Sequence, residues 1–302
     1  MKLYLFKTLW GHQGPIDAAI AGCRASGFDG IEGQVPADRS KRIVFQRHLA
    51  DSGLEFIAEI CTAGSYVPDR HATVARHLQS LRRQIERGRD CHPLFFTVIA
   101  GCDAWSVAQS VDFFGDAMAM ARELGVVASF ETHRSRSFFN PWATRDILKQ
   151  LPDLKLTCDF SHWCVVCERL IDTEPDVLAL CIERAYHVHA RVGYAQGPQV
   201  PHPAAVGYRD ALEAHENWWL QIWRGQFARR MAVSTMTPEF GPDGYLQSHP
   251  FTHEPAADLD EINRWMANRQ RERFIKYFAG THQTKPIGAS RPARSKDKNY
   301  VQ

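Results

Sequence analysis

The segment of residues 126–160, VVASFETHRSRSFFNPWATRDILKQLPDLKLTCDF, decides the fold. It begins with a short apolar run, Val126–Glu131, that ends on a carboxylate. The longer stretch Pro141–Leu151 has apolar residues three and four positions apart, and the short run Lys155–Asp159 again ends on a carboxylate. Short apolar runs predict buried strands, and the longer spacing predicts a helix. The segment therefore predicts a strand, a helix and a strand, with an acid at each strand end.

The same alternation extends over most of the 302 residues. We expect eight strands, at Leu3–Thr8, Gly30–Gly33, Glu55–Cys61, Leu94–Ala100, Val126–Glu131, Lys155–Asp159, Ala185–Arg191 and Ala232–Glu239. We expect eight helices, at Pro15–Ser26, Asp38–Ser52, Asp69–Arg87, Ser106–Leu124, Pro141–Leu151, Pro175–Arg184, Tyr208–Arg229 and Leu259–Phe278. Eight strand–helix pairs predict an α/β fold in which a parallel sheet closes into a single (β/α)8 TIM barrel. A doubly wound open sheet is the alternative, but Trp10–Gly14 lacks the glycine-rich phosphate turn that such a sheet would need.

Turn residues support these helix boundaries. Four glycines fall just past predicted helix ends, where a left-handed residue is favoured: Gly27, Gly53, Gly88 and Gly125. Pro15 and Pro141 stand near the starts of two helices. From residue 281 the apolar pattern stops and several lysines and arginines appear. We therefore expect one barrel domain over residues 1–280 and a flexible basic tail over 281–302.

Composition excludes several classes of protein. The chain is 44% hydrophobic with 17 Phe, 8 Trp and 8 Tyr, which is ample for a large core. The net charge of +2 gives no basic field for nucleic acid, and the longest apolar runs are too short to span a bilayer. The N-terminus favours a first strand over a signal peptide. We therefore expect a cytoplasmic protein that binds neither nucleic acid nor membrane.

Eight cysteines raise the alternatives of a disulfide framework or a metal site. Cys164 and Cys167 have the CxxC spacing, yet no second pair completes four ligands for zinc. A barrel of this size needs no disulfides for stability. We therefore expect buried or incidental roles for the cysteines.

Polar residues mark the ends of successive predicted strands. The ends of strands five, six and eight carry Glu131, Asp159 and Glu239, and strand seven carries His187 and His189. The carboxyl ends of barrel strands meet at the active-site mouth, so these side chains are expected to converge. Three converging carboxylates would repel one another unless a cation held them. The pattern predicts a divalent metal site.

The four expected ligands are Glu131, Asp159, His189 and Glu239. Three oxygen donors and one imidazole suit Mn2+ or Mg2+, with Zn2+ and Co2+ as alternatives. The period of two in a strand puts His187, His189 and Arg191 on one face. His189 lies nearer the mouth and is preferred as the ligand, which leaves His187 as a buried neighbour.

Five sequence motifs carry a family resemblance: FDGIEG, FETH, CDFSHW, HVHAR and PEFGP, in order along residues 1–280. Together they resemble the sugar phosphate isomerase/epimerase superfamily, the xylose isomerase-like TIM barrels. The resemblance implies that Glu131, Asp159, His189 and Glu239 bind one catalytic metal and that His162 contacts a substrate oxygen. It also implies that Glu131 and Glu239 remove and return a proton through a metal-bound enediolate. A homodimer or homotetramer is a further implication.

Proton abstraction next to a carbonyl needs a Lewis acid and a positioned base, which a metal and a glutamate would provide. With the family resemblance, this chemistry leads us to expect a small polyhydroxy carbonyl substrate, either a sugar or a hydroxy-keto compound. The residues expected to contact it are His133, His162, Arg191, Gln196 and His12. Arg191 offers a two-pronged grip on an acid group, and Gln196 lies in a long loop after strand seven.

Three alternatives to an isomerase or epimerase stay open. A lyase of the inosose or dehydroshikimate dehydratase type would begin with the same proton abstraction. An abasic-site endonuclease would require further metal ligands and a groove for DNA, which the balanced charge disfavours. A binding protein could retain the barrel without turnover. A measurement of bound metal would distinguish such a binding protein from the enzymes.

Overall fold

The computed structural model describes residues 1–242 and 244–279. The boundary at residue 280 and the tail expected at 281–302 lie outside the described residues. Within the described part, no helix is long and apolar enough to cross a membrane.

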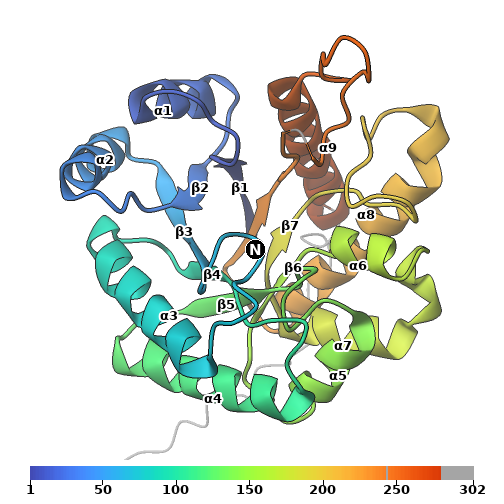
Figure 1. The fold of residues 1–302 in the computed structure, drawn as a ribbon. Helices are drawn as coiled ribbons and strands as arrows, with labels where there is room; N and C mark the ends of the chain where they lie inside the picture. Colours follow the sequence, from blue (N-terminus) through green and yellow to red (C-terminus); the bar gives the residue numbers. More distant parts are fainter. Residues whose placement is uncertain (243, 280–302) are drawn as a thin grey trace, which may run out of the picture.

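Eight parallel strands form a closed barrel in sequence order, as predicted (Figure 1). They are β1 (Lys2–Thr8), β2 (Gly30–Gln34), β3 (Glu55–Cys61), β4 (Phe96–Ile99), β5 (Ala128–Glu131), β6 (Leu156–Cys158), β7 (Ala185–His189) and β8 (Val233–Thr237). The first and last strands close the barrel, with Lys2 opposite Val233 and Leu5 opposite Met236. An α/β TIM barrel is therefore confirmed, and the open doubly wound sheet is excluded.

The helices surround the strands on the outside (Figure 1). They are α1 (Ile16–Ala25), α2 (Arg39–Ser52), α3 (Val74–Gly88), α4 (Val107–Glu123), α5 (Pro141–Leu148), α6 (Ser161–Val166), α7 (Pro175–Arg184), α8 (Arg209–Ala228) and α9 (Leu259–Ala279). The sequence predicts eight of these, and α6 is the addition. Helix α6 begins directly behind Asp159, whose Oδ1 accepts a hydrogen bond of 3.0 Å from the Ser161 amide. The prediction missed it because six residues are too few to show a helical period.

Alternation along the strands separates two environments. In β3, Phe56 and Ala58 face outward into the main core, whereas Ile57 packs inside the barrel with Phe6 and Phe95. These three interior side chains form a separate small apolar cluster. Polar side chains fill other positions of the interior, including a chain of hydroxyls formed by Thr97, Thr157 and Ser129. The barrel interior therefore contains both a small apolar cluster and a buried polar region.

Helix ends follow the predicted turn residues with one exception. Gly53 follows α2 with φ 65°, and Gly27 and Gly125 are also left-handed. Gly88 was expected to behave in the same way, but its φ of −85° is ordinary, and it is the last residue of α3. A Cβ at Gly88 would lie 2.9 Å from the ring of Phe96. Glycine is needed there for close helix–strand packing, not for a left-handed turn.

Four strands end earlier than predicted: β4, which ends at Ile99, and the three strands β6, β7 and β8. Asp159 lies just beyond β6, Arg191 two residues beyond β7, and Glu239 two residues beyond β8. All three side chains are nevertheless buried. The loops that follow these strands therefore carry part of the polar cluster at the barrel mouth.

Candidate metal centre and active site

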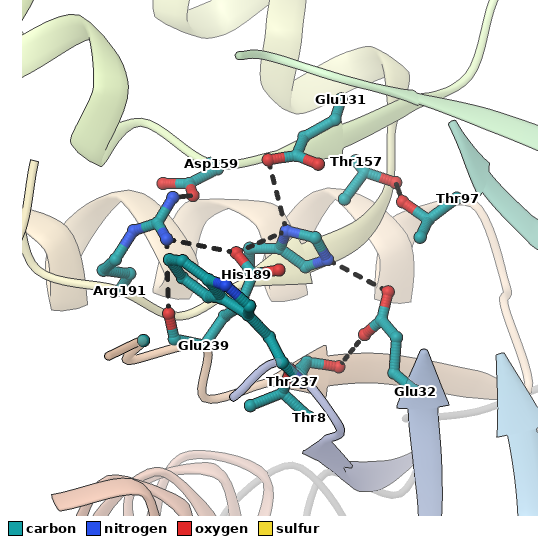
Figure 2. Close-up of polar contacts among 12 residues, drawn as sticks. Thr8, Glu32, Thr97, Glu131, Thr157, Asp159, His189, Arg191, Thr237 and Glu239 are labelled. Carbon is teal, nitrogen blue, oxygen red and sulfur yellow. Dashed lines mark hydrogen bonds and ion pairs between the residues drawn. The ribbon is translucent and has the colours of Figure 1, made fainter. Parts of the chain in front are cut away.

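The four residues predicted as metal ligands come together in one buried cluster. Glu131 ends β5, Asp159 follows β6, His189 ends β7 and Glu239 follows β8. One nitrogen or oxygen atom from each side chain lies within 4.8 Å of those from the other three (Figure 2). The order of the strands around the barrel is what brings these side chains, distant in sequence, to one point.

Glu32 of β2 orients His189 from the opposite side of its ring (Figure 2). Its Oε1 lies 3.1 Å from Nε2 of His189, and its Oε2 lies 3.2 Å from Nε2 of His187. The hydroxyl of Thr237 also donates to Oε2 of Glu32. Although burial opposes ionisation, His189 and His187 hold the pKa of Glu32 well below its ordinary value. An ionised Glu32 accepts the Nε2 proton of His189, so Nδ1, which faces the cluster, is the nitrogen that a metal ion would bind.

One buried atom of the cluster, Oε2 of Glu131, has no polar partner in the described structure, and Nδ1 of His189 forms no well-aligned hydrogen bond. The His189 Nδ1 atom lies 3.0 Å from Oε2 of Glu239 and 3.4 Å from Oε1 of Glu131. A space of about 10 Å³ lies beside them, lined in part by Glu131 and Glu239. It is large enough for about one water-sized sphere. Three carboxylates and one imidazole whose donor atoms lie within 4.8 Å of one another fit a single divalent ion.

The carboxyl groups of the cluster are crowded and poorly compensated. Burial raises the pKa of Glu131 to about 8, although His189 acts in the opposite direction. Burial also raises the pKa of Asp159, although Arg191 opposes the change. Burial by itself would lower the pKa of His189, but the surrounding carboxylates, Glu239 foremost, hold it well above its ordinary value. The three raised pKa values all indicate that the cluster has too little positive charge. A bound metal ion would supply that charge.

Arg191 supplies part of the missing positive charge. Its Nη2 donates to the carboxylate of Asp159 and lies 2.7 Å from Nε2 of His162. Its Nη1 lies 3.3 Å from the backbone oxygen and 3.4 Å from Oε2 of Glu239, and its Nε donates to the Ser161 hydroxyl over 3.1 Å. The carboxylates that Arg191 contacts are thus those of the protein itself. The guanidinium holds two of the candidate ligands in place.

His133 and His162 form a pair of rings beside the cluster, with centroids 4.1 Å apart. The His162 Nε2 atom lies 3.5 Å from Asp159 and 3.8 Å from Glu131, whereas its Nδ1 is buried without a partner. The His133 Nδ1 donates to the backbone oxygen of Arg134. Burial lowers the pKa of both histidines well below the ordinary value. Two neutral imidazoles therefore stand next to the candidate ligands, ready to form hydrogen bonds.

Three aromatic side chains cover the cluster. Trp10, Tyr66 and Tyr245 all line the small space beside Glu131 and Glu239. The ring of Trp10 lies 5.6 Å from that of Tyr66 and 4.8 Å from that of Tyr245. This cover excludes bulk water, which strengthens every electrostatic interaction beneath it.

His12 and Gln196 lie apart from the cluster. The His12 Nε2 atom contacts the backbone oxygen of Pro15 at 3.2 Å, and its ring lines a separate cavity of about 390 Å³ beside α9. Gln196 is exposed in the loop after β7. The neighbouring Gln199 is buried and ties this loop to Gly241 through two hydrogen bonds. The structure therefore brings His133, His162 and Arg191 to the candidate ligands, and leaves His12 and Gln196 outside.

The CxxC cysteines take no part in the site. Cys164 is buried in α6, where its thiol donates to the backbone oxygen of Phe160 at 3.4 Å. Among the described residues, no group of three or more candidate metal ligands contains a cysteine. All eight cysteines are free thiols.

Sequence reasoning missed Glu32, Tyr66 and Tyr245. Glu32 was visible as an acid at the end of a strand, and its alignment with the inward histidines of β7 was the available signal. Tyr66 and Tyr245 lie in loops, where no periodicity fixes the direction of a side chain. Their place over the cluster could be found only from the folded chain.

Comparison with known proteins agrees with the fold. The family model described as xylose isomerase-like TIM barrel matches residues 20–204. No curated protein sequence matches the chain. Among solved structures, an L-ribulose 3-epimerase matches with a TM-score of 0.62 and 13% identity, over 95% of this chain and 100% of that one.

Two further solved structures match over most of their length. The IolI protein with a bound zinc atom has a TM-score of 0.60 and 13% identity, over 91% of this chain and 99% of that one. The probable 3-DHS dehydratase AsbF from Bacillus anthracis has a TM-score of 0.56 and 14% identity, over 89% and 98%. At these identities the likeness shows the fold alone.

Proposed function

The chain belongs to the xylose isomerase-like TIM barrel family, and we propose that it is a divalent-metal-dependent isomerase or epimerase of a small sugar or hydroxy-keto compound. The observation that carries the proposal is the buried cluster of Glu131, Asp159, His189 and Glu239, with an unpartnered oxygen on Glu131. A structural role alone would not leave a carboxylate oxygen without a partner in the core.

The proposed ligands of the metal are these four side chains. Mn2+ or Mg2+ suits the three carboxylates, and Zn2+ or Co2+ is the alternative that the imidazole allows. When bound, the ion would act as a Lewis acid that makes a proton on the carbon next to a carbonyl more acidic. Glu32 would keep His189 in the tautomer that presents Nδ1 to the ion.

Glu131 and Glu239 are the proposed acid–base pair. They lie on either side of Nδ1 of His189 and line the same covered space. One carboxylate removes the proton from carbon and the other returns it at a different face or a neighbouring carbon. The aromatic cover limits exchange of that proton with water.

His133 and His162 are the proposed contacts to the substrate's oxygens. Both are neutral, and His162 has a buried nitrogen without a partner. Arg191 acts indirectly by holding the carboxylates of Asp159 and Glu239. Contacts from Gln196 and His12 would require these residues to approach the cluster, and they remain predictions from the sequence.

A dehydratase is the second candidate function. One of the matching structures is a probable dehydratase, and elimination of water begins with the same removal of a proton by a carboxylate. The two functions differ in their product, because a lyase releases one water for each turnover and an isomerase releases none.

Deuterium exchange tests the proposal. The metal-loaded protein is incubated in heavy water with a panel of ketoses, hydroxy-keto acids and inososes, and each product is analysed by NMR and mass spectrometry. We expect deuterium at a carbon next to a carbonyl in at least one compound, with loss of at least about 100-fold in rate in Glu131→Gln and Glu239→Gln. Glu213→Gln, an exposed position on α8, is the matched control and should retain the rate. Exchange that persists in both cluster variants would overturn the assignment.

A further inference from the structure

A cavity of about 990 Å³ lies beside the cluster of candidate ligands and is lined by residues of the barrel mouth and of helix α3. Trp10 and Tyr66 line both this cavity and the small space that contains Glu131 and Glu239. The larger volume is at the upper end of the range of about 300–1,000 Å³ for ligand pockets. It can therefore accommodate the part of a substrate that extends away from the reacting carbons.

Helix α3 presents three arginines to this cavity: Arg76, Arg83 and Arg87. Their spacing of seven and four residues puts them along one side of the helix. The buried side of the same helix carries Leu81 and Ile85, which anchor it to the core. The three guanidinium groups are thus placed by a fixed element and not by a loop.

Two of the three arginines that line the cavity lack an anionic partner among the described residues. Within residues 1–242 and 244–279, Arg83 and Arg87 form no hydrogen bond or ion pair, and Arg76 has only Asp69 at 4.0 Å. Arg82, their neighbour on the same helix, instead pairs with both carboxylate oxygens of Glu123, at 2.9 and 2.6 Å. The helix therefore compensates the charge of Arg82, which does not line the cavity, and leaves Arg83 and Arg87 of the cavity lining without a counter-charge in the described part of the chain.

The remaining charges around the cavity do not correct this imbalance. Burial lowers the pKa of Arg87, and the nearby cations Arg42 and Arg83 lower it further. Glu59 is the one carboxyl group among the described residues that line the cavity, and it accepts a hydrogen bond of 2.9 Å from Gln34. Burial, with repulsion from Glu239, raises the pKa of Glu59 to about 7, which reduces its negative charge. An anion in the cavity would relieve the repulsion among the arginines.

We propose that this cavity binds the anionic group of the substrate, a phosphate or a carboxylate, through Arg83 and Arg87, with Arg76 contributing. Guanidinium groups bind both kinds of anion through paired hydrogen bonds. The claim that the cavity binds an anion does not depend on the proposed function. The identification of that anion as part of a substrate rests on the proposed function. An anionic group on the substrate would narrow the substrate class from neutral sugars to sugar phosphates or sugar acids.

Calorimetric titration of the chelator-treated protein tests the anion site. Metal is removed first, so that a probe cannot bind to it. Inorganic phosphate, gluconate and the neutral sugar glucose are titrated at the same ionic strength. We expect one of the two anions to bind and glucose not to bind. The anion that binds distinguishes a phosphate group from a carboxylate.

The Arg83→Gln, Arg87→Gln double variant should bind that anion about 100-fold more weakly, since each charged contact is worth about tenfold. Arg82→Gln is the matched control on the same helix and should bind like the unaltered protein. Both positions of the double variant lie on the surface of α3, and thermal unfolding confirms that the variant is folded. The proposal fails if the unaltered protein binds neither anion, or if the double variant binds as tightly.

A second comparison separates this proposal from the proposed function. Asp159→Asn should lose the metal but retain anion binding, because Asp159 does not line the cavity. Anion binding without any proton exchange would contradict only the enzymatic function. Proton exchange on a neutral sugar, unaffected by the double variant, would contradict only the anion site.

Discussion

Oε1 of Glu32 lies 3.1 Å from Nε2 of His189, so the other ring nitrogen of His189 faces Glu131 and Glu239. The contact joins β2 to β7 across the barrel interior. It fixes which nitrogen carries the proton, and this decides whether the cluster can accept a metal.

Glu32→Gln is expected to lower metal affinity about 10–100-fold, because an amide is a weaker acceptor for the proton of His189. A competition titration against a chelator measures the change. Glu59→Gln is the matched control, since Glu59 is also buried in the barrel but contacts Gln34 instead of His189. Equal losses in the two variants would contradict the orienting role of Glu32.

The metal-free protein should become less stable as pH rises from 7 to 8.5. The pKa of Glu131 is raised from an ordinary value of 4.5 to about 8, so the folded protein retains a proton that the unfolded chain has released. Stability from this group is complete below about pH 4.5 and is lost as pH rises through about 8. His133 and His162 have lowered pKa values and are already neutral over this window, whereas the raised pKa of His189 acts in the same direction as that of Glu131.

Thermal unfolding of the metal-free protein and of Glu131→Gln measures this effect. The variant should lose less stability over the same pH range, and added Mn2+ should stabilise the unaltered protein more at pH 8.5 than at pH 7. A melting temperature of the metal-free protein that rises with pH would contradict the expectation.

Arg191→Gln should destabilise the metal-free protein by about 3–5 kcal/mol, because it leaves buried carboxylates without their cation. Urea unfolding measures the loss, and added metal should recover more stability in the variant than in the unaltered protein. Arg82→Gln removes an exposed ion pair and should cost no more than about 1 kcal/mol. If both variants lose the same small amount, Arg191 does not compensate the cluster.

Gly88→Ala should cost about 1–3 kcal/mol, because the added Cβ would lie 2.9 Å from the ring of Phe96. Gly115 is the matched control: it lies inside α4, and a Cβ there would meet nothing within 4 Å. Gly115→Ala should therefore stabilise the protein by about 0.5–1 kcal/mol. Changes of the same sign in the two variants would contradict the assigned role of Gly88.

The barrel and the position of the cluster could be predicted because both depend on local patterns. Short apolar strands that end in polar residues define the mouth, and parallel closure then brings Glu131, Asp159 and His189 together. The period within β7 likewise predicts that His187 and His189 share a face, and both contact Glu32. The features that depend on strand positions and on the alternation along a strand can therefore be predicted from the sequence.

Features that depend on loops or on neighbours in space could not be predicted in this way. Helix α6 is too short for a periodic signal, and the direction of Tyr245 depends on the folded loop after β8. The contacts of Arg191 depend on side chains from several elements, so the sequence alone could not show that it holds Asp159 and Glu239. The arginines of α3 resemble an ordinary solvated helix face until the cavity beside them is known.

Titration of chelator-treated protein with Mn2+, followed by electron paramagnetic resonance of the free ion, tests the central claim most directly. We predict one equivalent of bound Mn2+ in the unaltered protein, retained in the exposed control Asp112→Asn. Binding should be lost or weakened at least about 100-fold in Asp159→Asn and Glu239→Gln. No bound ion in the unaltered protein, or undiminished binding in both cluster variants, would contradict the metal centre and the function built on it.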